Sequence, residues 1–169
     1  MTLTMVRRVV SFEVIGIAQP KGSASAFVIQ KPGQKPRAIV TTNNPKSKGW
    51  QQLVFEQAQG VAHDGLFVGP VVLTVTFRLP RPKSLPKHVL HHTKKPDLDK
   101  LVRSTKDALK GVLYGDDSQV VDLHARKVYV AIAAAPCARI TLAEAAPPDL
   151  VQPDLPLEGL AALFWETGA

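Results

Sequence analysis

The sequence predicts an α+β fold: one domain with a small sheet and two main helices. Two runs rich in β-branched residues, at positions 9–17 and 70–79, are typical of strands. Two other segments, 48–61 and 97–112, place apolar residues three and four positions apart, as helices with one buried face do. The chain has 169 residues and is 45% hydrophobic, which is enough to bury a core.

The elements are expected in a simple order along the chain. Strands at 9–17, 25–30 and 37–42 come first, and the segment 31–37 (KPGQKPR) is a basic hairpin tip or loop. The first helix, the strand at 70–79 and a loop up to residue 95 follow. After the second helix, strands at 120–135 and 138–143 complete a domain over residues 1–145. Residues 146–169 form a proline-rich acidic tail with a short apolar segment.

Composition excludes several classes of protein. No run of 18 or more apolar residues occurs, so we expect no membrane-spanning helix and no membrane partner. The first residues lack the full apolar region and the cleavage site of a signal peptide. Cys137 is the single cysteine, which rules out an internal disulfide framework. A cytoplasmic location is therefore expected.

Charge is distributed unevenly along the chain, whose net charge is +7. Residues 1–96 hold 14 Lys and Arg against 3 Asp and Glu, whereas residues 97–169 hold 7 against 11. The first part predicts a polyanionic partner. The acids of the second part would repel that partner unless a cation lies between them.

Two acidic pairs flank the second helix. Asp97 and Asp99 stand at its start, and Asp116 and Asp117 follow the turn after its end. Asp at the start of a helix is also a common capping signal, so a purely structural role is the alternative. The two pairs can meet only if the turn doubles back beside the helix.

If the two acidic pairs lie close together, their carboxylates would suit a hard divalent cation. Mg²⁺ is usually held by one or two carboxylates together with water and phosphate oxygens. Asp97, Asp99 and one of Asp116 and Asp117 would supply such a site for Mg²⁺, with Mn²⁺ as a substitute. A cation on the polar face of the helix, such as Arg103 or Lys106, would stabilise charge that develops on a phosphate. This chemistry is that of a metal-dependent nuclease.

The same stretch carries an ordered set of motifs, which covers about a fifth of the chain closely. In chain order they are Asp97-Leu98-Asp99, Arg103, Asp107-Ala108-Leu109 and Asp116-Asp117-Ser118-Gln119-Val120, with Lys127 beyond. This set resembles the signature of the RusA family of Holliday junction resolvases, found in bacteria and their phages. The chain departs from that signature at Lys100, where the family usually has Asn, and at Arg103, where it has Lys.

The resemblance implies a small mixed-sheet homodimer that cleaves four-way DNA junctions using Mg²⁺. It implies that Asp97, Asp99 and Asp117 are the catalytic and metal-binding acids, that Asp116 is their neighbour and that Arg103 is the helix cation. It also makes residues 1–145 a nuclease domain. The role implied is recombination and repair.

Basic residues in the loops and along the second helix are expected to contact branched DNA. They are Lys21, Lys35, Arg37, Lys46, Lys48, Arg81, Lys83, Lys87, Lys94, Lys95, Lys100, Lys106 and Lys127. His88, His91 and His92 are interpreted as solvated loop residues near DNA rather than a zinc site, because no Cys or close acid completes a ligand set. Phe67 and Tyr114, both in turns, are candidates for stacking on a junction base.

Two other functions stay open. The first is a branched-DNA-binding protein without catalysis, whose acids are structural. The second is a metal-dependent nuclease with a different substrate, such as flaps or RNA. Asp107 is interpreted as a surface charge paired with Arg103 or Lys110.

Overall fold

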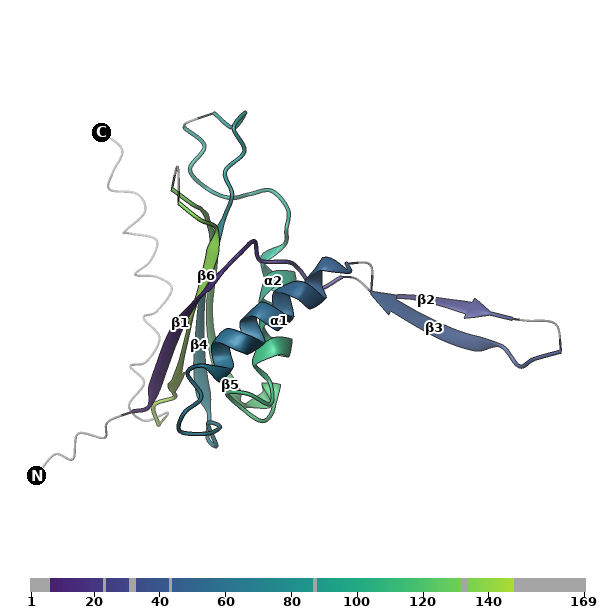
Figure 1. The fold of residues 1–169 in the computed structure, drawn as a ribbon, viewed down its shortest axis with the longest axis horizontal. Coiled ribbons are helices and arrows are strands. Elements are labelled where there is room, and N and C mark those ends of the chain that lie inside the picture. The colour runs from purple at the N-terminus through teal and green to yellow at the C-terminus, as the bar shows by residue number, and fades with distance from the viewer. Residues whose placement is uncertain are drawn as a thin grey trace, which may run out of the picture.

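The computed structural model describes residues 7–22, 24–30, 33–42, 44–86, 88–131 and 134–147 (Figure 1). Its main sheet contains β1 (Val9–Ile15), β4 (Val71–Leu79), β5 (Val120–Tyr129) and β6 (Cys137–Glu144), in the order β1-β6-β4-β5. β6 pairs antiparallel with β1 and β4, whereas β4 and β5 are parallel. The predicted α+β fold with a small mixed sheet is therefore confirmed.

Two helices cover one face of this sheet (Figure 1). They are α1 (Lys46–Gln59) and α2 (Leu98–Leu109), and α2 joins the parallel strands β4 and β5. Alternate residues of β4 point toward the helices: Val71, Leu73, Val75, Phe77 and Leu79 are all buried. This period of two is what a strand with one covered face requires. The residues between them are more exposed, so the core lies on the helical side of the sheet.

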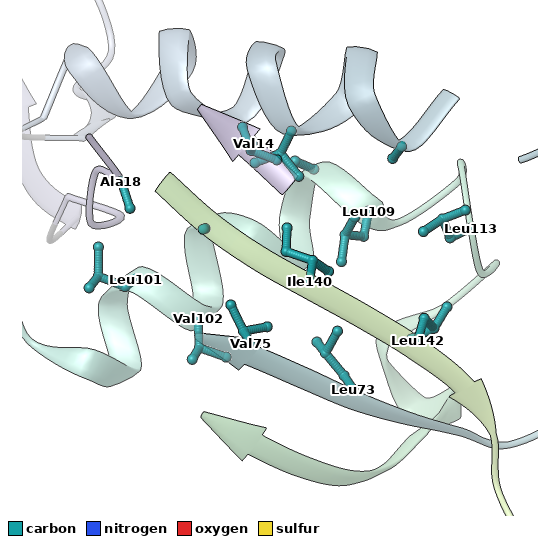
Figure 2. Packing of buried hydrophobic residues seen from close by; sticks show 14 of the residues in the cluster. Val14, Ala18, Leu73, Val75, Leu101, Val102, Leu109, Leu113, Ile140 and Leu142 are labelled. Atoms are coloured by element: carbon teal, nitrogen blue, oxygen red, sulfur yellow. The ribbon is translucent and has the colours of Figure 1, made fainter. Parts of the chain in front are cut away.

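The core joins the sheet to both helices (Figure 2). Leu101, Val102 and Leu109 of α2 pack with Leu73 and Val75 of β4 and with Ile140 and Leu142 of β6. Trp50 of α1 is buried as predicted, and its indole Nε1 donates to Thr105 Oγ1 at 3.3 Å. That hydroxyl in turn donates to the Leu101 carbonyl at 3.0 Å. The hydrogen bonds fix how α1 lies along α2, because a buried polar group without a partner is costly.

A separate hairpin extends away from this body (Figure 1). It consists of β2 (Ala24–Ile29) and β3 (Arg37–Thr42), which pair only with each other. Its root is attached to α2: the Lys21 amide donates to the Lys100 carbonyl at 2.9 Å, and Lys21 Nζ lies 2.5 Å from Asp107 Oδ2. The partner of Asp107 is therefore Lys21 rather than Arg103 or Lys110, because the turn before β2 packs across the helix.

Three further expectations need correction. β5 ends at Tyr129 instead of continuing to 135, because its sheet neighbour β4 ends at Leu79, where the Val130 amide donates to the Leu79 carbonyl. Phe67 and Tyr114 are buried, so neither is free to stack on a base. His92 is half-buried against the Tyr129 ring, 4.6 Å between centroids, and is not a solvated loop residue.

Some expectations concern residues outside the described ranges. The tail beyond residue 147 and Lys87 both fall there. Among the helices that the structure does describe, none has the length and apolar character needed to cross a membrane.

Candidate active site

The turn after α2 brings the second acidic pair back to the helix. Gly111 has φ +79°, a left-handed conformation that glycine adopts without penalty, and its amide donates to the Tyr114 carbonyl at 2.7 Å. The Phe67 amide then donates to the Leu113 carbonyl at 2.7 Å, which binds the turn to the segment before β4. The chain therefore reverses within a few residues and enters β5 beside α2.

A capping box sets the geometry of the returning acids. Asp116 is the N-cap of the single-turn 3-10 helix η1 (Asp117–Gln119), and Gln119 is its last residue. The Ser118 backbone amide donates to the Asp116 carboxylate, and the Asp116 backbone amide donates to the side-chain oxygen of Gln119. The side-chain nitrogen Nε2 of Gln119 also donates to the carbonyls of Phe67, Val68 and Gly69, at 2.8, 3.1 and 3.0 Å. Gln119 therefore holds the turn in place. The spacing of Asp116 and Gln119 is a recognisable capping signature, although our sequence analysis assigned no role to Gln119.

Asp99 and Asp117 line one hollow between α2 and β5, which we call the acidic hollow. Its volume is about 620 Å³. Arg103 and Lys106 are its other polar residues, and its apolar lining consists of Leu98, Val102, Leu123 and Ala125. Asp99 and Asp117 are 18 positions apart in the chain, so the turn brings one acid of each pair to the lining of the same hollow.

Asp117 is held from two sides. Lys106 Nζ lies 3.9 Å from its Oδ1, and the Tyr114 hydroxyl lies 3.4 Å from the same oxygen. Burial raises the pKa of Tyr114, and the negative charge of Asp117 raises it further, so the phenol stays protonated and able to donate. The same hydroxyl lies 3.2 Å from the Lys106 carbonyl, so its one proton is shared between that carbonyl and Asp117.

Asp97 and Asp116 face different surroundings. Asp97 is the N-cap of α2 but makes no side-chain cap hydrogen bond; its Oδ2 lies 3.0 Å from Lys100 Nζ, which lowers the pKa of Asp97. Asp116 accepts from Lys110 Nζ at 2.6 Å and from the Ser118 amide at 3.0 Å. These bonds, with Lys110 the largest cause, lower the pKa of Asp116 well below its usual range. Asp116 is thus engaged in the cap and with Lys110.

Three carboxylates do not converge in the part of the chain that the structure describes. Among the described residues, no group of three His, Cys, Asp or Glu side chains is placed to hold a metal ion. Asp99 and Asp117 nevertheless match the donor chemistry of Mg²⁺, which is commonly held by one or two carboxylates while water and phosphate oxygens complete its shell. The residues of the acidic hollow fit that ion.

The loop that leads into α2 is pinned to β5. Lys127 Nζ donates to the carbonyls of Lys94 and Pro96, at 2.7 and 2.8 Å. Arg81 donates to the carbonyls of Pro86 and Val89, and its guanidinium lies over the Tyr129 ring. Lys127 and Arg81 were expected to contact DNA; here both bind main-chain carbonyls. Lys127 in particular binds two carbonyls of the segment that leads directly to Asp97.

Most of the other basic candidates are available to a ligand. Those exposed on the surface are Lys35, Arg37, Lys46, Lys48, Lys83, Lys94 and Lys95. Lys21, Lys100 and Lys106 are half-buried and lie beside Asp107, Asp97 and Asp117 respectively. The exposed set extends from the hairpin over α1 to the loop before α2.

Comparison with known proteins gives two findings. The family model described as Endodeoxyribonuclease RusA matches residues 20–140. A Bacillus subtilis (strain 168) protein named "Uncharacterized protein YqaN" is 39% identical over 94 residues, which are 50% of this chain and 66% of that relative. That share is just under two thirds of the relative's length. The family match includes both acidic pairs and Lys127.

Removing the Lys127 ammonium should destabilise the entry to α2. In Lys127→Met the carbonyls of Lys94 and Pro96 lose a charged donor, which we expect to lower the free energy of unfolding by about 1–3 kcal/mol. Urea unfolding followed by circular dichroism measures this. Lys83→Met, at an exposed lysine in the same loop, is the control and should change stability by less than about 0.5 kcal/mol. Equal effects in the two variants would contradict the anchoring role.

The Asp116 cap should stabilise the fold only where its carboxyl is charged. Because its pKa is lower in the folded chain than in the unfolded chain, its contribution is present above about pH 4 and is lost as the pH falls through the folded-state pKa. Asp116→Asn should therefore lower the urea midpoint at pH 7 and approach the wild-type midpoint near pH 2. A deficit of equal size at both pH values would show that charge is not the cause.

Proposed function

The chain belongs to the RusA endodeoxyribonuclease family, and on that premise we propose that it is a Mg²⁺-dependent endonuclease that resolves Holliday junctions. The observation that carries the proposal is the acidic hollow, in which Asp99 and Asp117 lie with Arg103 and Lys106. We propose that the protein acts on branched DNA in recombination and repair, in the cytoplasm of a bacterium or of a phage-infected host.

In this proposal each polar residue of the hollow has one task. Asp99 and Asp117 would hold the metal ion, and Asp116 would support Asp117 through the cap. Asp97 lies outside the acidic hollow and would become a further ligand only once its ion pair with Lys100 opens. When bound, Mg²⁺ (or Mn²⁺) polarises the phosphodiester and activates a water molecule. Arg103 and Lys106 stabilise negative charge on the phosphate oxygens during cleavage. Tyr114 holds the orientation of Asp117.

The surface around the hollow suits a DNA backbone. Lys94 and Lys95 are exposed before Asp97, and Lys35 and Arg37 lie on the projecting hairpin. No acid occurs from residue 65 to residue 96, so this surface attracts phosphate without local repulsion. Two copies related by a two-fold axis would place two such sites on one junction, which is the arrangement that paired cuts require. We therefore propose a homodimer.

Replacing Asp99 tests the proposed function. Asp99→Asn keeps the shape of the side chain but removes a ligand charge, so cleavage of a synthetic four-way junction should fall by about 100-fold or more while junction binding is kept. Gel assays with and without Mg²⁺ measure both. Asp122→Asn is the control: Asp122 is exposed on β5 beside His124, outside the hollow, and its loss should leave cleavage unchanged.

The same assay separates the alternatives. Tight, salt-sensitive junction binding by the wild type with no Mg²⁺-dependent nick would favour a non-catalytic branched-DNA-binding protein. Preferred cleavage of flap, duplex or RNA competitors would favour a nuclease of another specificity. If Asp99→Asn loses both junction binding and folding, the role of Asp99 is to stabilise the start of α2 and not to take part in cleavage.

A further inference from the structure

A second hollow lies on the other side of the start of α2. We call it the proline-lined hollow; its volume is about 460 Å³, within the range of sites that take a small ligand, roughly 300–1,000 Å³. Its apolar wall consists of Ile17, Pro20, Leu79, Pro80 and Pro96. These residues come from the segment after β1, the end of β4 and the loop before α2. Prolines and the packed ends of strands make a wall that changes little in shape.

The lining of this hollow also includes charged and neutral polar residues. Lys95 and Lys100 bring positive charge, Asp97 brings a carboxylate that pairs with Lys100 at 3.0 Å, and Gln19 brings a side-chain amide. His92 also lines the hollow; its Nδ1 is closed to solvent, so Nε2 is the ring nitrogen that a ligand would meet. Burial lowers the pKa of His92, so its ring is neutral near pH 7 and has one donor and one acceptor nitrogen. An amide and a neutral imidazole can read the edge of a nucleobase, whereas the lysines suit phosphates.

The proline-lined hollow adjoins the proposed cleavage site. Asp97 belongs to its lining, and Asp99, two residues further along α2, belongs to the acidic hollow. If a strand bound at Asp99 continues past Asp97, the nucleoside next to that phosphate reaches the proline-lined hollow. Removing a base from its stack costs least where the duplex is already interrupted, as at the branch point of a junction.

We propose that the proline-lined hollow is a nucleobase subsite that takes the unstacked base next to the scissile phosphate. The apolar wall covers the faces of the base, Gln19 and His92 bind its edge, and Lys95 binds a flanking phosphate, since Lys100 is paired with Asp97. This inference rests on the proposed function and deepens it, because it assigns to a specific hollow the selection of where the strand is cut.

A fluorescent base tests the subsite without cleavage. Four-way junctions carry 2-aminopurine, which brightens when it leaves the stack, at each nucleotide within two positions of the mapped nick. They are bound to the protein without divalent cations. We expect a several-fold rise at the nucleotide beside the nick, and the loss of that rise in Ile17→Arg, whose long side chain occupies the hollow. Ile15→Arg is the matched control: Ile15 is exposed, lies two residues before Ile17 and does not line the hollow, so the rise should persist.

The outcomes separate this inference from the proposed function. A Mg²⁺-dependent nick without any fluorescence rise, or an equal rise in Ile17→Arg and wild type, would overturn the subsite and leave the nuclease intact. Absence of any nick would overturn the proposed function and the subsite with it. If Ile17→Arg does not fold, an abasic nucleotide at the same position replaces it: wild-type affinity should fall by at least about fivefold, and an unchanged affinity would overturn the subsite.

Discussion

Two like charges from different parts of the chain meet at one hollow, and much of the architecture between them serves to keep them there. Both carboxylates carry negative charge, so nothing in their own interaction brings Asp99 and Asp117 to one hollow, and the backbone must do so. Gly111 lets the chain turn sharply, and Gln119 ties the returning turn to three carbonyls ahead of β4. Lys106 and Arg103 balance the two charges within the same hollow. The site is therefore built on a rigid helix and a locked turn rather than on a loose loop.

In the fold, the basic residues and the acids of the site lie on different elements. Exposed lysines and arginines lie on the hairpin, on α1 and on the loop before α2, whereas the acids of the site are confined to the start of α2 and to η1. A polyanion would be held by the first group and would meet the acids only where a cation can lie between them. Half-buried cations serve a second purpose, since Lys21 fixes the hairpin root and Lys127 fixes the approach to Asp97.

The features that sequence could predict are those carried by local patterns. The apolar repeat of α2 is strong enough to locate that helix, and the alternation in β4 identifies a strand with one covered face. Features that depend on distant contacts were not accessible: Tyr114 and Phe67 occupy turns yet are buried, because they pack on each other's segments and on the core. Likewise, adjacent acids such as Asp116 and Asp117 have the same side chain, and only the hydrogen bonds of η1 direct one to Lys110 and the other to the hollow.

Calorimetric titration of the DNA-free protein with Mn²⁺ tests the proposal that Asp99 and Asp117 together bind one divalent cation. Asp99→Asn and Asp117→Asn should each weaken binding by more than about tenfold, while Asp122→Asn should bind as the wild type does. Both variants must retain the wild-type circular dichroism spectrum. Wild-type affinity in either Asp99→Asn or Asp117→Asn would contradict the claim, because a ligand of the ion cannot be removed without loss.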